Sequence, residues 1–244
     1  YLFATSDAFI ITRNTILYNV VFIVINLVFG IIIALMINAV RQKAARKIFQ
    51  SVILLPQCIS IVIVAYLVNA FLAYDFGYVN TRVLAEMGKE GISWYQEKAY
   101  WPWILILVNT WKGIGLNVIL YLSAIVGVDK TYYEAADIDG CSRLKQIWYI
   151  TLPLIRPTII TLLILSIGRI FYSDFGLFYQ VPMNSGALYD VTNTIDTYVQ
   201  RALIEQHNIS MSSAASVYQS LVGFILVMAT NAVIRKIDSE NALF

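Results

Sequence analysis

Polar and charged side chains interrupt two apolar stretches of this sequence, and they are the residues best suited to contact a ligand. A charge inside hydrocarbon is costly unless it faces a water-filled cavity or an opposite charge. Lys112 lies near the middle of its stretch. It either donates hydrogen bonds to an acidic or hydroxylated ligand or pairs with a neighbouring subunit as a packing cation. The residues predicted to line a ligand path are Asn109, Trp111, Lys112 and Asn117 in one stretch, and Arg169, Tyr172 and Asp174 at the end of another.

Two members of this set have a favoured alternative role. Arg169 and Asp174 end their apolar stretch, where charged side chains commonly anchor a helix at the outer face of a membrane. We therefore expect a structural role for both residues before a ligand contact. The set as a whole places aromatic rings among amides and a few charges.

The residue sets that enzymes need are missing from the apolar stretches. An intramembrane hydrolase would need two facing aspartates, a serine with a histidine, or the His-Glu-x-x-His pattern, and none occurs there. The single histidine, His207, and the two cysteines, Cys58 and Cys141, have no metal-binding spacing. The phosphate-binding pattern G-x-x-x-x-G-K-[ST] is also absent from the sequence. We expect a chain that is not an enzyme, has no metal site or cofactor, and takes its energy from a separate polypeptide.

The connection from residue 128 to residue 152 predicts two short helices separated by a glycine. Either Asp129 or Thr131 can cap the first helix, and Thr131 with Glu134 has the capping-box spacing, in which two side chains satisfy free backbone N–H groups. Gly140 can adopt the left-handed conformation that ends a helix. The first helix would present a small, smooth face made of Ala135, Ala136 and Ile138.

The second helix of this connection is predicted to start at Ser142 and to stop where Pro153 opens the next apolar stretch. Its apolar side would consist of Leu144, Ile147 and Trp148.

Helices in a membrane must position these residues. The 244 residues are 59% hydrophobic and 13% charged, an apolar share well above that of soluble domains. Crossing about 30 Å of hydrocarbon takes about 20 residues, and backbone groups there must pair within the segment, so each span is a helix. A soluble bundle would need polar outer faces, which these stretches lack. We predict an all-α, polytopic transmembrane bundle that forms one domain over residues 1–244, with spans at 15–39, 51–73, 101–126, 153–172 and 214–234.

Basic residues predict the direction of the spans, because short loops rich in Lys and Arg stay in the cytoplasm. Alternation then puts residues 127–152 and the tail with Arg235 and Lys236 inside. It puts residues 74–100 and 173–213 outside, and Tyr1 outside. The basic residues of the first connection are Arg41, Lys43, Arg46 and Lys47. Aromatic residues predicted to lie at the outer headgroup level are Trp94, Tyr95, Tyr100, Trp101 and Trp103.

The connection between residues 128 and 153 resembles the EAA loop of binding-protein-dependent ABC importer permeases of type I architecture. In that family the loop contains a cytoplasmic coupling helix, which binds a cleft on the ATPase and transmits its closure to the spans. The resemblance implies that Glu134 meets a basic residue of the ATPase. A capped surface helix without a partner is the alternative, but capping does not explain an apolar face exposed to the cytoplasm. The residues that carry the resemblance are Glu134, Ala135, Ala136, Asp137, Ile138, Gly140, Ile150, Leu152 and Pro153.

The resemblance covers nearly the whole chain and is strongest to permeases for sugars, especially oligosaccharides or polysaccharides. Similar strings occur at residues 9–15, 133–158 and 196–199. Such permeases usually have six spans, which implies a first span before residue 1. The resemblance also implies a location in the bacterial cytoplasmic membrane and alternating access. The implied partners are a second, different permease subunit, two ATPase subunits that bind ATP and Mg, and an extracellular solute-binding protein, with no nucleic acid.

Two other functions stay open at this point. The chain can be an ABC importer permease for another small solute, or a self-powered secondary transporter or channel. The second would show inverted repeats and helix breaks in mid-membrane, whereas the glycines here lie mostly near span ends. The external segment from Tyr189 to Gln206 either packs over the cavity mouth, receives the binding protein, or is a solvated cap.

Overall fold

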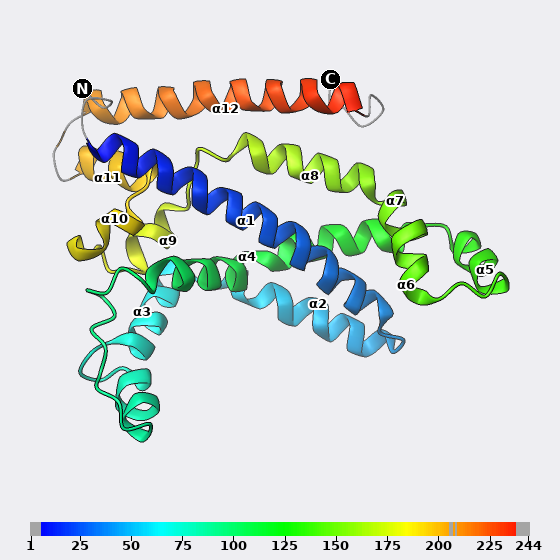
Figure 1. The fold of residues 1–244 in the computed structure, drawn as a ribbon, viewed down its shortest axis with the longest axis horizontal. Coiled ribbons are helices and arrows are strands. Elements are labelled where there is room, and N and C mark those ends of the chain that lie inside the picture. Colours follow the sequence, from blue (N-terminus) through cyan, green and yellow to red (C-terminus); the bar gives the residue numbers. More distant parts are fainter. Residues whose placement is uncertain (1–5, 205–206, 208, 238–244) are drawn as a thin grey trace.

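A computed structural model describes residues 6–204, 207 and 209–237, and that part of the chain contains helices and no strand (Figure 1). The all-α prediction is therefore confirmed. The elements are α1 (Ser6–Ala39), α2 (Lys43–Cys58), α3 (Ile61–Leu72), the π-helical η2 (Val79–Leu84), α4 (Trp101–Val126), α5 (Lys130–Ile138), α6 (Arg143–Gln146), the π-helical η3 (Ile147–Thr151), α7 (Leu152–Leu154), α8 (Arg156–Gly168), α9 (Phe175–Gln180), the 3-10 helix η4 (Gly186–Leu188), α10 (Tyr189–Thr192), α11 (Ile195–Ile204) and α12 (Ile209–Ile237).

Three of the five predicted spans are continuous helices long and apolar enough to cross a membrane. They cover Ala8–Ala39, Trp101–Val126 and Ile209–Lys236. The other two predicted spans are broken. The second bends by 91° between α2 and α3, and the fourth bends by 60° between α7 and α8. The count of five spans holds if each bent pair crosses the membrane once.

Prolines explain where both broken spans bend. Pro56 lies in the last turn of α2. Ile59, the first residue after this helix, leaves the helical region with φ −79° and ψ 132°. Pro157 stands in the first turn of α8, so it cannot donate to a carbonyl one turn back. The predicted single helix over 153–172 is thus wrong at both ends, because α8 begins at Arg156 and ends at Gly168.

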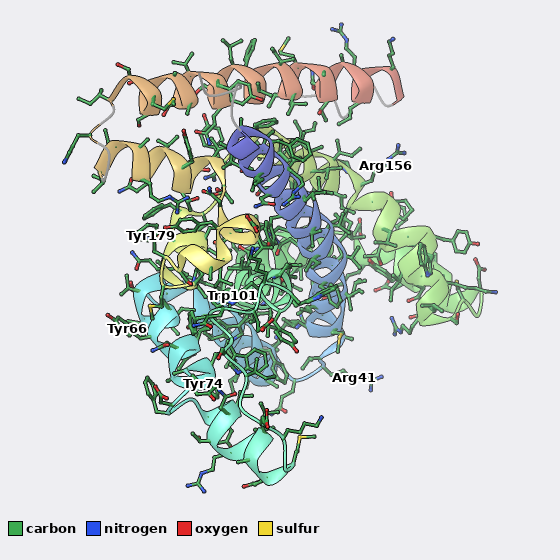
Figure 2. The ribbon with its side chains drawn as sticks, turned by 60° about the vertical axis from the view of Figure 1, so that its left-hand side comes forward. Arg41, Tyr66, Tyr74, Trp101, Arg156 and Tyr179 are labelled. Atoms are coloured by element: carbon green, nitrogen blue, oxygen red, sulfur yellow. The ribbon has the colours of Figure 1, made fainter. Side chains whose placement is uncertain are left out.

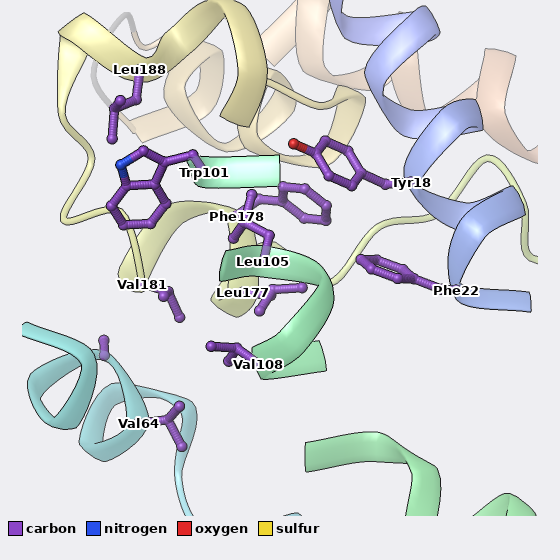
Figure 3. Close-up of a cluster of buried hydrophobic side chains, with 11 residues drawn as sticks. Tyr18, Phe22, Val64, Trp101, Leu105, Val108, Leu177, Phe178, Val181 and Leu188 are labelled. Carbon is purple, nitrogen blue, oxygen red and sulfur yellow. The ribbon is translucent and has the colours of Figure 1, made fainter. Parts of the chain in front are cut away.

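The first half of α4 forms the main hydrophobic core with helices from both halves of the chain (Figure 3). Trp101 and Leu105 are completely buried there. The ring of Tyr18 meets the ring of Phe178 edge-on at 4.9 Å. The buried members of this cluster are Tyr18 and Phe22 of α1, Val64 and Ala65 of α3, Trp101, Leu105 and Val108 of α4, Leu177 and Phe178 of α9, Val181, and Leu188 of η4.

Two helix pairs approach closely at glycines. A Cβ atom on Gly115 would lie 2.2 Å from the carbonyl oxygen of Ile53, so α4 and α2 touch through their backbones. A Cβ atom on Gly168 would lie 2.6 Å from a methyl group of Val227, which joins α8 to α12. Small residues at contacts of this kind let membrane helices pack without large side chains between them.

The predicted aromatic belt is only partly an interfacial belt. Trp101 is buried, and its indole N–H donates to the carbonyl of Trp94 at 2.7 Å. The indole N–H of Trp94 donates in turn to the Asn80 side chain at 2.9 Å. These contacts fold the connection from 74 to 100 against the start of α4. Trp103, with 73% of its surface exposed, keeps the position expected of a ring at the headgroup level.

The helices run so that the segments predicted to be cytoplasmic gather at one end. In Figure 1 the α1–α2 connection, the α5–α7 segment and the end of α12 all lie toward that end. The elements α3, α9, α10 and α11 lie toward the other end (Figure 1). The direction of the whole bundle in the membrane stays a prediction from the basic residues.

Burial of Trp101 predicts a large difference between two neighbouring tryptophans. Trp101→Ala removes a completely buried ring and leaves the carbonyl of Trp94 without its donor, so it should cost about 3–5 kcal/mol of stability. Trp103→Ala is the matched control, because that ring is exposed. Thermal unfolding of the purified protein in detergent measures both changes. Equal melting temperatures for the two variants would contradict the core described here.

Candidate functional site

The helix α5 begins at an aspartate cap. The Asp129 carboxylate accepts a hydrogen bond from the backbone N–H of Thr131 at 3.0 Å, and this contact holds the pKa of Asp129 below its ordinary value. Of the two caps considered, Asp129 is therefore the correct one. The predicted capping box of Thr131 and Glu134 does not form, because Thr131 already lies inside the helix.

The end of α5 and the start of the next helix follow the prediction, but the stop at Pro153 does not. Gly140 has φ +71°, and the N–H of Cys141 donates to the carbonyl of Ala136 at 2.8 Å, as in a left-handed helix end. Ser142 precedes α6 as expected. The helix then continues through Pro153 to Leu154. The wider π-helical turn η3 ends at Thr151, two residues before this proline, which has no backbone N–H to donate.

Side-chain contacts fix α5 against the α6–α7 segment. The buried Gln146 side chain donates to the Asp137 carboxylate at 2.6 Å, and the Arg143 guanidinium lies 3.8 Å from the same carboxylate. The Tyr133 hydroxyl and the Thr151 hydroxyl are hydrogen-bonded at 2.9 Å. Asp137, predicted as part of the docking loop, therefore has an internal role in holding α5 in place.

The opposite side of α5 is open to the surroundings. Glu134, Ala135 and Ile138 are exposed, and Ile138 keeps 87% of its surface. Leu152 of α7, also predicted as part of the docking loop, instead packs against the core cluster around Ile155. Exposed apolar side chains of this kind are available for contact with a second molecule. Other exposed large side chains between α5 and η3 are Tyr132, Leu144, Trp148 and Tyr149, which are 54–78% exposed.

A polar cavity of about 500 Å³ opens between α1, α4 and the end of α8. It brings together five of the seven residues predicted to line a ligand path. Arg169 and Asp174, for which a structural role at the membrane face was favoured, both line this cavity. Asp174 also has a structural part, because its carboxylate accepts the N–H of Leu177 and caps α9. The lining residues are Asn19, Phe22, Ile23, Asn26, Asn109, Asn117, Ser166, Arg169, Tyr172, Ser173 and Asp174.

The other two predicted path residues lie elsewhere. Trp111 lines an apolar groove between α1 and α2. The Lys112 ammonium group donates to the backbone carbonyl of Gln57 at 3.2 Å, at the end of α2 next to the 91° bend. Its partner is thus a carbonyl of the same chain, which neither interpretation of Lys112 had included.

Sequence reasoning missed the residues that α1 contributes to the cavity. The Asn26 side-chain oxygen is buried and has no hydrogen-bond partner within the described residues, so it is free to accept from a ligand or water. Asn19 and Asn26 are seven residues apart, a spacing that places both on one face of a helix. That spacing within an apolar stretch was the available signal.

One rim of the cavity is fixed by a carboxylate on α11. Asp196 accepts from the backbone N–H of Ser173 at 2.6 Å, from its hydroxyl at 2.7 Å, and from Gln219 of α12 at 3.2 Å. The Tyr172 hydroxyl is also hydrogen-bonded to Ser220 of α12 at 3.0 Å. The backbone that carries Arg169 to Asp174 is therefore held by α11 and α12.

The described part of the external segment, residues 189–204, packs on the start of α1. The Asn14 side chain donates to the carbonyls of Asp190 and Asn193 at 2.9 and 3.0 Å, and the Tyr18 hydroxyl donates to Val191 at 2.9 Å. Residues 205 and 206, at the end of this segment, lie outside the described residues. These contacts place the segment on the start of α1, beside Asn14 and Tyr18, which do not line the polar cavity. Packing over the cavity mouth and receiving a binding protein both stay predictions.

A helical bundle with apolar spans, a polar cavity between them and an exposed helix on one connection defines a multi-pass membrane transport protein. The chain belongs to the family of binding-protein-dependent transport system inner membrane components, whose model matches residues 26–239.

Named relatives and solved structures agree with this assignment. The chain is 34% identical to "Protein LplB" and 34% identical to the "Polygalacturonan/rhamnogalacturonan transport system permease protein YteP", both of Bacillus subtilis (strain 168), over 98% of this chain and 74% of each relative. It also resembles a chain in the crystal structure of a bacterial ABC transporter that imports the acidic polysaccharide alginate. The TM-score is 0.90 at 32% identity, covering 97% of this chain and 82% of that chain.

The contact between Asp137 and Gln146 predicts that α5 loosens when the amide is removed. Gln146→Leu keeps the volume of a buried side chain but deletes the donor, at a cost of about 1 kcal/mol, so the amides of α5 should exchange hydrogen about fivefold faster. Gln96→Leu, at an exposed position, is the control. Hydrogen exchange read by mass spectrometry measures the rates. Unchanged protection of residues 130–138 would show that Gln146 does not hold α5.

Proposed function

We propose that this chain is one permease subunit of an ATP-driven importer that takes up an oligosaccharide or polysaccharide fragment. The observation that supports this most directly is the exposed side of α5, which has the family's Glu-Ala-Ala sequence at Glu134 and an apolar surface around Ile138. A helix held rigidly on one side and open on the other is suited to bind a second protein.

The partner at α5 is proposed to be a cytoplasmic ATPase subunit, which would bind ATP and Mg. The open side of α5 offers one carboxylate among small and apolar side chains. A basic residue in a complementary cleft would fix the register of such a helix, because charge-assisted hydrogen bonds are directional. Closure of the ATPase would move α5 and, through Tyr133 and Thr151, the α7–α8 segment.

The polar cavity is proposed as part of the substrate path. Its amides, the Arg169 guanidinium and the Tyr172 ring provide the mixture of donors, acceptors and flat faces that sugars bind. Relatives support a carbohydrate, since the printed names include polygalacturonan, rhamnogalacturonan and arabinooligosaccharides. The neighbouring crystal structure contains an alginate ABC transporter in complex with an alginate pentasaccharide-bound periplasmic protein.

The remaining partners of the proposed importer are a solute-binding protein outside the membrane and a second, different permease subunit inside it. Alternating access would then open the cavity outward when ATP closes the ATPase pair. A self-powered transporter was expected to have helix breaks in mid-membrane, because discontinuous helices are common in such proteins. The broken second span meets that expectation, so the lack of breaks no longer counts against this class. Family membership and the exposed α5 favour the ATP-driven importer.

Reversing the charge at Glu134 should uncouple transport from ATP hydrolysis. Glu134→Lys would place a cation against the proposed basic residue of the ATPase, so uptake in proteoliposomes should fall at least about tenfold while membrane insertion stays normal. Glu86→Lys, at an exposed position of the connection predicted to be outside, is the matched control. If Glu134→Lys assembles and transports like the unchanged protein, α5 is not the docking helix.

Changes in the cavity should affect affinity for sugar before they affect assembly. Asn117→Leu and Arg169→Gln each remove hydrogen-bond donors from the lining, so the half-saturating sugar concentration should rise about fivefold to tenfold. Leu107→Ala on the outer side of α4, where that side chain is 70% exposed, should leave it unchanged. Uptake of an acidic and a neutral oligosaccharide is measured for each variant. An unaltered concentration dependence with both sugars would remove the cavity from the substrate path.

A further inference from the structure

We propose that the groove between α1, α2 and α4 is a binding site for an anionic phospholipid, with an acyl chain in the groove and the headgroup at the α1–α2 connection. This inference does not depend on what the protein transports. It rests on an open apolar groove and on a cluster of basic residues at one end of it.

The groove is lined by apolar and aromatic side chains and has a volume of about 570 Å³. Ligand pockets in proteins are commonly about 300–1,000 Å³. Three lining residues are open at the surface, since Met36, Phe49 and Val52 are 65%, 50% and 54% exposed. The lining residues are Ile33, Met36, Ile37 and Val40 of α1 and the connection after it, Phe49, Val52, Ile53 and Pro56 of α2, and Trp111 and Ile114 of α4.

The groove runs from the α1–α2 connection toward the bend of the second span. Its lining covers residues 33–40 on one helix and 49–56 on the other, and seven residues of helix rise about 10 Å. One end therefore lies at Val40, next to the basic connection, and the other end lies at Pro56, deep in the hydrocarbon. This is the direction in which an acyl chain descends from its headgroup.

The end of the groove at Val40, which we call the shallow end, is followed by basic residues. They have no acidic neighbours in the sequence. Arg41 follows the groove residue Val40, Lys43 begins α2, and both side chains are exposed. The sequence has no acidic residue between Asp7 and Asp75. Figure 2 shows the Arg41 side chain directed away from the helices. Basic sites of this kind on the cytoplasmic side attract anionic headgroups, and each cation strengthens binding by about fivefold.

A third basic residue, Arg46, fixes the shape of the shallow end. The Arg46 guanidinium donates to the carbonyl of Asn38, in the last turn of α1, at 2.7 Å and to the carbonyl of Val40, just after α1, at 3.1 Å. Carbonyls at a helix end have no partner within the helix. One terminal nitrogen of Arg46 is thus occupied by backbone contacts. Lys47 lines a different cavity, between α2 and α4, so we assign the phosphate to Arg41 and Lys43. These contacts join the end of α1 to the start of α2 at this end of the groove.

The test uses the purified protein together with the subunits that co-purify with it. Equal amounts of phosphatidylglycerol and phosphatidylcholine are added in detergent, and the retained lipids are counted by native mass spectrometry. The paired substitution Arg41→Gln and Lys43→Gln removes the headgroup contacts, and Val52→Trp fills the groove. The matched controls are Arg82→Gln with Lys89→Gln for the charge, both at exposed positions, and Leu107→Trp for the ring.

The unchanged protein should retain phosphatidylglycerol in preference to phosphatidylcholine and melt at a higher temperature with it. Both test variants should retain about tenfold less of it than their controls. If only the charge variant loses lipid, the anion binds at the surface without the groove, and the proposal is wrong. It is also wrong if Met36→Cys, with Cys58→Ser and Cys141→Ser, cross-links efficiently to another subunit, because a protein then covers the groove.

Discussion

Hydrocarbon contains no water to pair with backbone groups, and this constraint decides how the second span can bend. Where α2 ends, the carbonyl of Gln57 accepts from Lys112 and the carbonyl of Pro56 accepts from the N–H of Ile59 at 3.2 Å. A cation at mid-membrane is costly alone, but the negative end of a helix offsets that cost. The bend directs α3 to α9, and both helices complete the core around Trp101.

The helix α4 joins the two parts of the molecule that the proposed function needs. Its first residues lie in the external core, its middle supplies Asn109 and Asn117 to the polar cavity, and its end leads within four residues to α5. A second route runs from α5 through Tyr133 and Thr151 to α7 and α8, and α8 ends at Gly168, next to Arg169 of the cavity. The proposed coupling therefore has two contiguous paths of packed helix, and the α11 carboxylate of Asp196 holds the far end of the second.

The sequence predicted the helical class, the third span to the residue, and the α5 helix with its glycine end, because these follow from hydrophobic length and from local capping chemistry. It did not predict the bends. Pro56 lies in the last turn of α2 and Pro157 in the first turn of α8, and whether a helix continues past a proline depends on the residues packed around it. It also could not assign Lys112, whose partner is a backbone carbonyl 55 residues away. The sequence also could not predict that Trp101 is buried. A ring near the end of a span lies at the headgroup level unless other segments pack over it, and those segments come from distant parts of the chain.

Cross-linking of α5 in the intact assembly tests the central claim most directly. A single cysteine at Ala135, introduced after Cys58 and Cys141 are replaced by serine, should form a cross-link with an ATPase subunit in inside-out vesicles, and the yield should change when ATP is bound. A cysteine at Ala135 that reacts with a membrane-impermeant reagent from outside the cell, or that reaches no other protein, would contradict the account.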